Sequence, residues 1–253
     1  IARRQRQMCI RDRSLIELNK ALSENKLFIA CQCLTQNLRL LLAEVDNNFY
    51  NTGEGIFAKD ITYRILEELT GYIGDLKEGA LLASSHHMRV LIELFATVEA
   101  IVIDTKNDHK KSYLKRYIRF HEIVYYKIYH QHEGTILELP EEISYKYFKE
   151  YAELPDELLS IFNKKRKDQL VQMQTWRGDC SIKDLLEQLP HRKEHLKNYD
   201  HLCLFTHCSP LVKYYKTQLF PEFKSSDENM LPITLRYAVD IFCLLYTSPS
   251  PRD

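Results

Sequence analysis

Glycine and proline are scarce in this chain. Its 253 residues include seven glycines and eight prolines. Folds built from many short strands need these residues at their turns, so the scarcity argues against a turn-rich β-sandwich or β-barrel. We therefore predict an all-α fold, in the form of a single helical domain of about eight helices.

No stretch of the chain is apolar without interruption over the roughly 18 residues that a membrane-spanning helix needs. The segment 80–103 comes closest, but Arg89, Glu93 and Glu99 interrupt it. We therefore expect no membrane association. We predict instead that 80–103 is a central apolar helix around which the other helices pack.

Cysteine follows no disulfide or metal-binding pattern. Five of the seven cysteines fall in 14–242, an odd number without regular spacing, which predicts free thiols and a cytoplasmic location. Cys31 and Cys33 have no second pair nearby, so small core side chains are the simpler interpretation. The histidines and cysteines between His201 and Cys208 also lack zinc-ligand spacing. We expect no metal and no cofactor.

The two ends of the chain differ in kind from the rest. Back-translated, residues 8–13 fit ATGTGTATAAGAGACAG, which resembles the transposase end used in tagmentation sequencing libraries. Residues 243–253 fit the reverse complement of that end followed by its adapter. We therefore expect 1–13 and 243–253 to be translated adapter sequence. The helical domain then occupies 14–242, as a metagenomic, bacterial fragment open at both ends.

Charge is nearly balanced in 14–242. Excluding the two ends removes six basic and two acidic residues from totals of 35 and 35, which leaves 29 against 33 and a net charge of −4. This mild acidity gives no electrostatic basis for binding nucleic acid. The N-terminal arginines that suggest otherwise belong to the excluded segment 1–13.

The spacing of apolar residues predicts where the helices lie. The first helical region is predicted to be one long helix, or two helices separated near Ser23–Asn25, which resembles an N-cap; 47–55 is predicted to be a loop. The helix at 58–77 carries isoleucine or leucine at every fourth position, as a buried stripe: Ile61, Ile65, Leu69 and Ile73. Helical periodicity marks ten segments, from which we expect the domain of about eight helices: 14–48, 58–77, 80–103, 109–131, 141–151, 156–175, 182–189, 192–206, 211–219 and 232–242.

Two charged residues share one face of the predicted central helix. Arg89 and Glu93 are four residues apart, and Ala96 and Ala100 continue the same face. One interpretation is an ordinary ion pair, worth roughly 0.2–0.5 kcal/mol. The other is that so apolar a helix keeps two charges, whose burial is costly, because they form a ligand site. The sequence leaves both interpretations open.

Arg116 and His121 form a second candidate site. They spell R-x-x-x-x-H, which resembles the catalytic motif of HEPN-type ribonucleases. That resemblance implies metal-independent RNA cleavage, in which His121 acts as general acid or base and Arg116 stabilises the phosphorane charge. Five residues correspond to about 140° of helix rotation, so one helix does not bring the two side chains together. The alternative is a basic, aromatic helix with a structurally hydrogen-bonded histidine.

A wider pattern joins the predicted central helix to the C-terminal half of the chain. The motif R-x-x-x-E is followed by W-x-G and then by a tyrosine and a histidine on a later helix. This order resembles an uncharacterised bacterial family of all-helical domains of unknown function, although Cys203 stands where that family has serine. The resemblance implies one grouped polar site: Arg89, Glu93, Trp176, Tyr199 and His207.

These patterns lead to three hypotheses. The first is a non-enzymatic binding or interaction domain for an unidentified small ligand or protein partner, in a stress or phage-defence system. The second is an HEPN-like ribonuclease acting through Arg116 and His121. Only this hypothesis makes nucleic acid a partner, and it requires a cleft of the kind that a homodimer forms. In the third, the charged pair only stabilises the fold.

Overall fold

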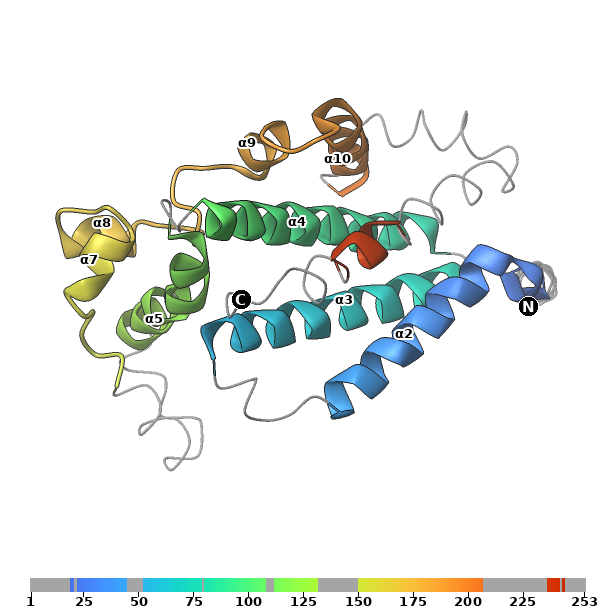
Figure 1. The fold of residues 1–253 in the computed structure, drawn as a ribbon, viewed down its shortest axis with the longest axis horizontal. Coiled ribbons are helices and arrows are strands. Elements are labelled where there is room, and N and C mark those ends of the chain that lie inside the picture. Colours follow the sequence, from blue (N-terminus) through green and yellow to red (C-terminus); the bar gives the residue numbers. More distant parts are fainter. Residues whose placement is uncertain are drawn as a thin grey trace, which may run out of the picture. The chain divides into compact units, whose positions relative to one another are not determined.

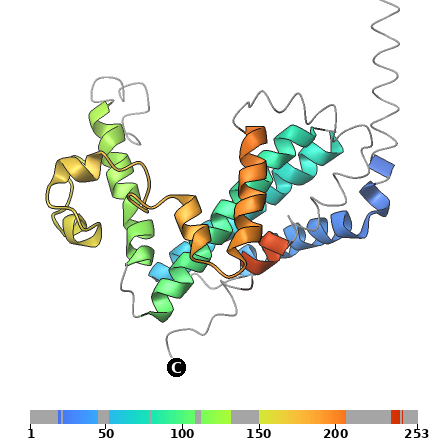
Figure 2. The same cartoon turned by 90° about the horizontal axis from the view of Figure 1, so that it is seen from above.

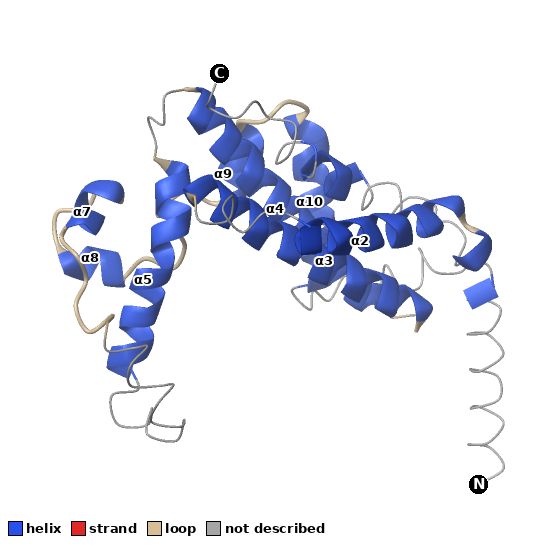
Figure 3. Cartoon of the chain, turned by 60° about the horizontal axis from the view of Figure 1, so that its bottom comes forward, coloured by secondary structure: helices blue, strands red, loops and turns tan. Residues whose placement is uncertain are grey.

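The computed structural model describes residues 19–20, 22–44, 52–78, 80–107, 112–131, 150–206, 236–241 and 243. Over these residues the chain consists of α-helices joined by turns and loops, with no β-strand (Figures 1 and 3). The predicted all-α fold is confirmed. The arrangement of the other helices around 80–103 stays a prediction. The predicted helix 211–219 and nearly all of 141–151 lie outside the described residues.

The chain divides into two compact units. Unit 1 comprises residues 1–49, 58–99 and 182–253, and unit 2 comprises residues 50–57 and 100–181. Two long helices, α3 (Gly53–Lys77) and α4 (Leu81–Lys106), contribute residues to both units. Unit 1 also contains α2 (Lys26–Glu44), α9 (Ile182–Glu187) and α10 (Arg192–Thr206). Unit 2 also contains α5 (Tyr113–Gln131), α7 (Glu157–Ile161) and α8 (Lys167–Val171).

Side-chain caps determine where two of the helices begin. The Asn25 side chain accepts hydrogen bonds from the backbone N–H groups of Leu27 (2.9 Å) and Phe28 (3.1 Å), so α2 begins after it, as predicted. The hydroxyl of Thr52 accepts a bond from the N–H of Gly55 at 3.0 Å. Helix α3 therefore begins at Gly53, and the prediction of a loop as far as residue 55 is wrong at its C-terminal end.

The buried stripe of α3 follows the true helical period rather than a spacing of four. Ile61, Ile65 and Leu69 are fully buried, as predicted, but Ile73 is only half-buried. A strict spacing of four residues drifts by about 40° at each step, because an α-helix has 3.6 residues per turn. The stripe instead continues through Tyr72, which is 0% exposed.

Helix α10 lies against α4 in unit 1 (Figure 2). The centre of the Phe95 ring on α4 lies 5.1 Å from that of His195 on α10. Nδ1 of His195 and the Tyr237 hydroxyl form a hydrogen bond of 2.7 Å. Along α10, His195, Tyr199 and Leu202 are buried at helical spacing. Burial lowers the pKa of His195, so the imidazole is neutral at physiological pH.

Unit 2 is built on the packing of α5 against α7 and α8. The predicted single helix 156–175 is wrong, because Asn163 has a φ of +51° and ends α7. The N–H of Lys164 bonds back to the carbonyl of Leu159 at 2.8 Å, and the N–H of Asn163 to that of Ser160 at 3.3 Å. These two bonds form a Schellman motif, with asparagine in the left-handed position. Ile123, Leu158 and Leu170 form the centre of the core beside it.

A buried carboxylate starts α5. The N–H of Tyr113, the first residue of α5, donates to Asp104 Oδ2 at 2.8 Å, and Asp104 is 4% exposed. Ser112, directly before the helix, has a φ of +53°. Asp104 therefore satisfies one of the N–H groups that a helix N-terminus leaves without an intrahelical partner.

We predict that Asp104→Ala lowers the free energy of unfolding by about 1–3 kcal/mol, because the buried N–H of Tyr113 loses its acceptor. Urea denaturation followed by circular dichroism measures this change. Asp179→Ala is the matched control, because Asp179 is fully exposed and its only described ion pair is with Lys164 at 3.6 Å. Equal stability of the two variants would contradict the capping role.

Candidate functional site

Three of the predicted site residues meet in unit 1. Arg89 Nε donates to Glu93 Oε1 at 3.0 Å within α4. The Tyr199 hydroxyl, from α10, donates to the same carboxylate oxygen at 3.2 Å and accepts from Arg89 Nη2 at 3.5 Å. The guanidinium carbon also lies 5.5 Å from the centre of the Tyr199 ring. A guanidinium, a carboxylate and a phenol thus form a closed polar triangle.

The positions of these residues follow from the helices that carry them. Arg89 and Glu93 are one helical turn apart, so their side chains project from the same face of α4. On α10, His195 lies one turn before Tyr199, and the contact of its ring with Phe95 places this part of α10 against α4. The apolar packing therefore brings the Tyr199 hydroxyl to the charged pair.

The charged pair keeps access to solvent. The Arg89 and Glu93 side chains are 19% and 31% exposed, whereas Tyr199 is 8% exposed. Burial and the negative charge of Glu93 raise the pKa of Tyr199 to about 12, so the phenol stays protonated and acts as a hydrogen-bond donor. Burial opposes the charge on Arg89, but Tyr199 and Glu93 outweigh it and raise the pKa of the guanidinium. The site therefore holds a fixed positive and a fixed negative charge at neutral pH.

The other two residues of the predicted group are not brought into this triangle by any described contact. Trp176 belongs to unit 2, where its ring packs edge-on against Tyr113 at 5.6 Å and Tyr117 at 5.7 Å. Gly178 has a φ of +69°, so the W-x-G segment forms a turn as its sequence indicates. His207 lies outside the described residues.

Arg116 and His121 are both on α5, and their side chains contact different residues. Arg116 Nε donates to the carbonyl of Ile161 at the end of α7, at 2.8 Å, and so ties two helices of unit 2 together. His121 is exposed, and its Nδ1 lies 2.6 Å from the carbonyl of Ile118, one turn earlier in the same helix. Each side chain thus has a polar contact of its own.

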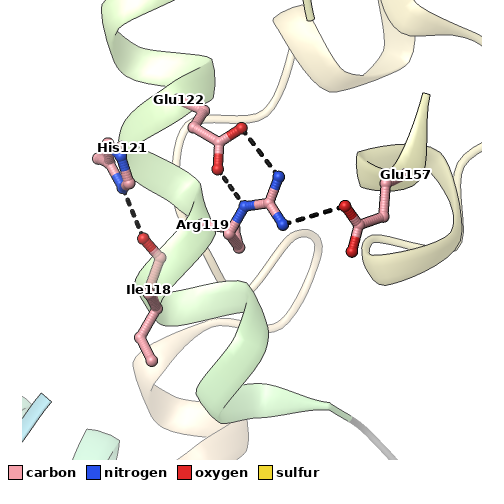
Figure 4. A network of polar contacts seen from close by, with 5 residues as sticks. All are labelled: Ile118, Arg119, His121, Glu122 and Glu157. Carbon is pink, nitrogen blue, oxygen red and sulfur yellow. Dashed lines mark hydrogen bonds and ion pairs between the residues drawn. The ribbon is translucent and has the colours of Figure 1, made fainter. Parts of the chain in front are cut away.

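Arg119, which lies between these two residues on α5, forms an ionic network that the sequence motifs did not indicate (Figure 4). Its guanidinium donates to both carboxylate oxygens of Glu122, and its Nη1 donates to Glu157 of α7 at 3.2 Å. Figure 4 shows His121 on a different side of α5 from this network. The hydrogen bond with Glu122 dominates and raises the pKa of Arg119. The network fastens α5 to α7.

A second cluster of titratable groups in unit 1 was also missed. His87 Nδ1 lies 2.7 Å from Glu68 Oε2, and His87 Nε2 lies 3.3 Å from Asp75 Oδ2. The histidine comes from α4 and both carboxylates from α3. Sequence spacing contains a usable signal, because Glu68 and Asp75 lie two helical turns apart on one face of α3. The pairing with α4 is a tertiary contact.

Two further classes of site are not represented in the described part of the chain. Within these residues, no three or more histidine, cysteine or acidic side chains are placed to hold a metal ion. None of the described helices has the length and apolar character of a membrane-spanning segment.

We predict that Tyr199→Phe lowers the free energy of unfolding by about 1 kcal/mol, because the hydroxyl that links Arg89 and Glu93 is lost while the ring remains. Denaturant titration measures the difference. Tyr63→Phe serves as the control, because Tyr63 is 45% exposed on α3 and its hydroxyl is expected to contribute little. A Tyr199→Phe protein as stable as the Tyr63→Phe protein would show that the triangle does not stabilise the fold.

Known proteins supply no assignment for this arrangement. No protein-family model, no curated protein and no solved structure matches the chain. The resemblances to the bacterial helical family and to HEPN-type ribonucleases therefore stay predictions. The geometry of the described residues is what supports a functional proposal.

Proposed function

We propose that this chain is a helical binding domain whose ligand site is centred on Arg89 and Glu93 of α4, with Tyr199 of α10 as the residue that orients them. The observation that carries the proposal is the closed triangle of 3.0, 3.2 and 3.5 Å contacts between three side chains, two of which stay partly exposed. Preorganised polar groups with partial solvent access are what a binding site requires.

Stability alone is a weak reason for this arrangement. An ion pair with solvent access contributes about 0–1 kcal/mol. Partly desolvating two charges on a helix with so apolar a surface costs free energy that this gain barely offsets. Arg89 and Tyr199 both have raised pKa values, and perturbed ionisable groups gather at functional sites more often than elsewhere. A ligand that uses the charged pair provides the missing reason for its presence.

The charges of the site indicate the chemistry of the ligand. Arg89 offers hydrogen-bond donors and Glu93 offers acceptors, and the formal charges of the two cancel. Arg89 attracts a polyanion such as RNA, but Glu93 repels it, so the pair gives RNA no net electrostatic attraction. The site therefore suits a neutral or zwitterionic ligand with both donor and acceptor groups, such as an amino acid or a peptide segment. That Trp176 and His207 belong with these residues rests on the resemblance to the helical family alone and stays a prediction.

The same proposal includes a cytoplasmic location and a role in bacterial stress or phage defence. The odd number and irregular spacing of the cysteines in 14–242 support a reducing compartment, because disulfide frameworks use paired cysteines.

Thermal-shift measurements test the binding proposal with defined probes: free glutamine, tetra-alanine, inorganic phosphate, ATP and a short single-stranded RNA. A ligand at about 100 times its Kd stabilises the native state by about 2.7 kcal/mol, which raises the Tm by about 5–10 °C. We expect glutamine or the peptide to give such a shift. Glu93→Gln and Arg89→Lys, which keep the shape of the site, are expected to abolish it.

The matched control uses another arginine–carboxylate pair one helical turn apart. Arg64 and Asp60 on α3 form a 3.2 Å ion pair, and their side chains are 56% and 44% exposed. Arg64→Lys and Asp60→Asn are expected to leave the ligand shift unchanged. The proposal is wrong if no probe shifts the Tm, or if the shift persists in both Glu93→Gln and Arg89→Lys.

The ribonuclease hypothesis makes a different demand on the chain. It requires cleavage of the RNA probe without added metal, and loss of that cleavage in both Arg116→Ala and His121→Ala. In the described structure, the polar contacts of these two residues are with the backbone carbonyls of Ile161 and Ile118. Metal-independent cleavage with this mutational pattern would replace the binding proposal.

A further inference from the structure

The His87 imidazole in unit 1 faces a carboxylate at each of its two ring nitrogens. Nδ1 lies 2.7 Å from Glu68 Oε2, and Nε2 lies 3.3 Å from Asp75 Oδ2. A neutral imidazole carries one N–H group, whereas the imidazolium carries two. The contacts on both sides are therefore satisfied together only when His87 is charged.

A glycine makes room for this ring. Gly71 lies on α3 between the two carboxylates, three residues after Glu68 and four before Asp75. A Cβ atom built on Gly71 would lie 2.3 Å from Cε1 of His87, far inside van der Waals contact. Glu68, Gly71 and Asp75 thus form a socket, named here the α3 socket, that fits the imidazole edge-on.

Asp75 depends on the charge of His87. Its Oδ2 atom is buried and has no aligned hydrogen bond within the described residues, so its compensation is the 3.3 Å approach of Nε2. In the described structure, the titratable groups facing the imidazole are Glu68 and Asp75 of α3 and, on its own helix, the ring of His86 with its centre 6.0 Å away. A neutral imidazole has one N–H for the two carboxylates, and the shorter contact with Glu68 favours placing it on Nδ1. Deprotonation then leaves the buried Oδ2 of Asp75 without a donor, which is costly.

We propose that His87 is a proton-sensing residue. While the imidazole is charged, it holds α4 against the α3 socket, and its deprotonation breaks this contact. The device spans the short connection between α3, which ends at Lys77, and α4, which begins at Leu81. It lies two residues before Arg89 on the same helix. It stands on contacts that do not include the proposed ligand site, so it is independent of the binding proposal.

The direction of the pH effect follows from linkage. The Glu68 hydrogen bond, together with the charges of both carboxylates, outweighs burial and raises the pKa of His87. A group with a raised pKa contributes stability fully below its unfolded value of about 6.5, and the contribution disappears as pH rises through the folded value. Buried His195 has a lowered pKa and acts in the opposite sense, so its effect appears on the acid side.

Hydrogen exchange between pH of about 6 and about 9 tests the proposal. After correction for intrinsic rates, we expect the opening constant of amides near His87 and in the α3 socket to rise with pH. The rise amounts to about tenfold for each unit by which the folded pKa exceeds the unfolded one. His87→Gln is expected to remove this dependence, because its amide does not titrate. Adjacent His86→Gln is the matched control, since His86 is exposed, and is expected to retain it.

A side-chain titration by NMR measures the ring of His87 directly in the native sequence. Its Cε1–H resonance, assigned by its absence from the spectrum of His87→Gln, is expected to titrate above about 6.5, the ordinary value for histidine. A midpoint at or below that value, or a pH-dependent opening that persists in His87→Gln, would overturn the proposal.

Gly71→Ala tests the fit of the socket. Alanine is normally the better helix former, so this change alone would stabilise α3. In the native sequence we expect the new Cβ to push the ring off the carboxylates, lowering the Tm and removing the pH dependence of opening. In a His87→Ala background the ring is absent, so the same change is expected to raise the Tm. The same sign in both backgrounds would contradict the socket.

Discussion

Burial of apolar side chains along α3 and α4 is the interaction on which unit 1 depends. Ile61, Ile65 and Leu69 of α3 and Leu91 and Ile92 of α4 are all 0% exposed. Apolar burial is the dominant favourable term in folding, and it is not directional. Polar groups on these two helices must therefore satisfy one another locally. The Arg89 triangle and the His87 socket are two described examples, and both depend on the register that apolar packing sets.

Local sequence signals predicted much of this architecture, because they act within a few residues. Asn25 caps α2 as expected, and the stripe through Ile61, Ile65 and Leu69 is buried. The single helix predicted at 156–175 failed at one backbone position. Asn163 in the left-handed conformation divides one predicted helix into two short ones. Asparagine is a known alternative to glycine there, but the sequence alone does not distinguish it from an ordinary helical asparagine.

The candidate site was likewise predictable only where its contacts are local in sequence. That Arg89 and Glu93 share a face follows from their spacing, and the structure adds Tyr199 because the packing of α10 brings it there. Contacts between α3 and α4 depend on how the two helices are paired. The periodicity of the sequence therefore could not predict that the ring of His87 lies opposite Gly71. The grouping of Trp176 with the candidate site rests on the family resemblance and stays a prediction.

The position of Trp176 has a consequence for spectroscopy. It is the single tryptophan of the chain, and its ring contacts those of Tyr113 and Tyr117 in unit 2. Indole fluorescence therefore monitors unit 2, whereas far-ultraviolet circular dichroism senses the helices of both units. Coincidence of the two signals during denaturation would identify one cooperative transition, and divergence would identify two. The chain thus carries a built-in optical label that separates the melting of one unit from that of the whole.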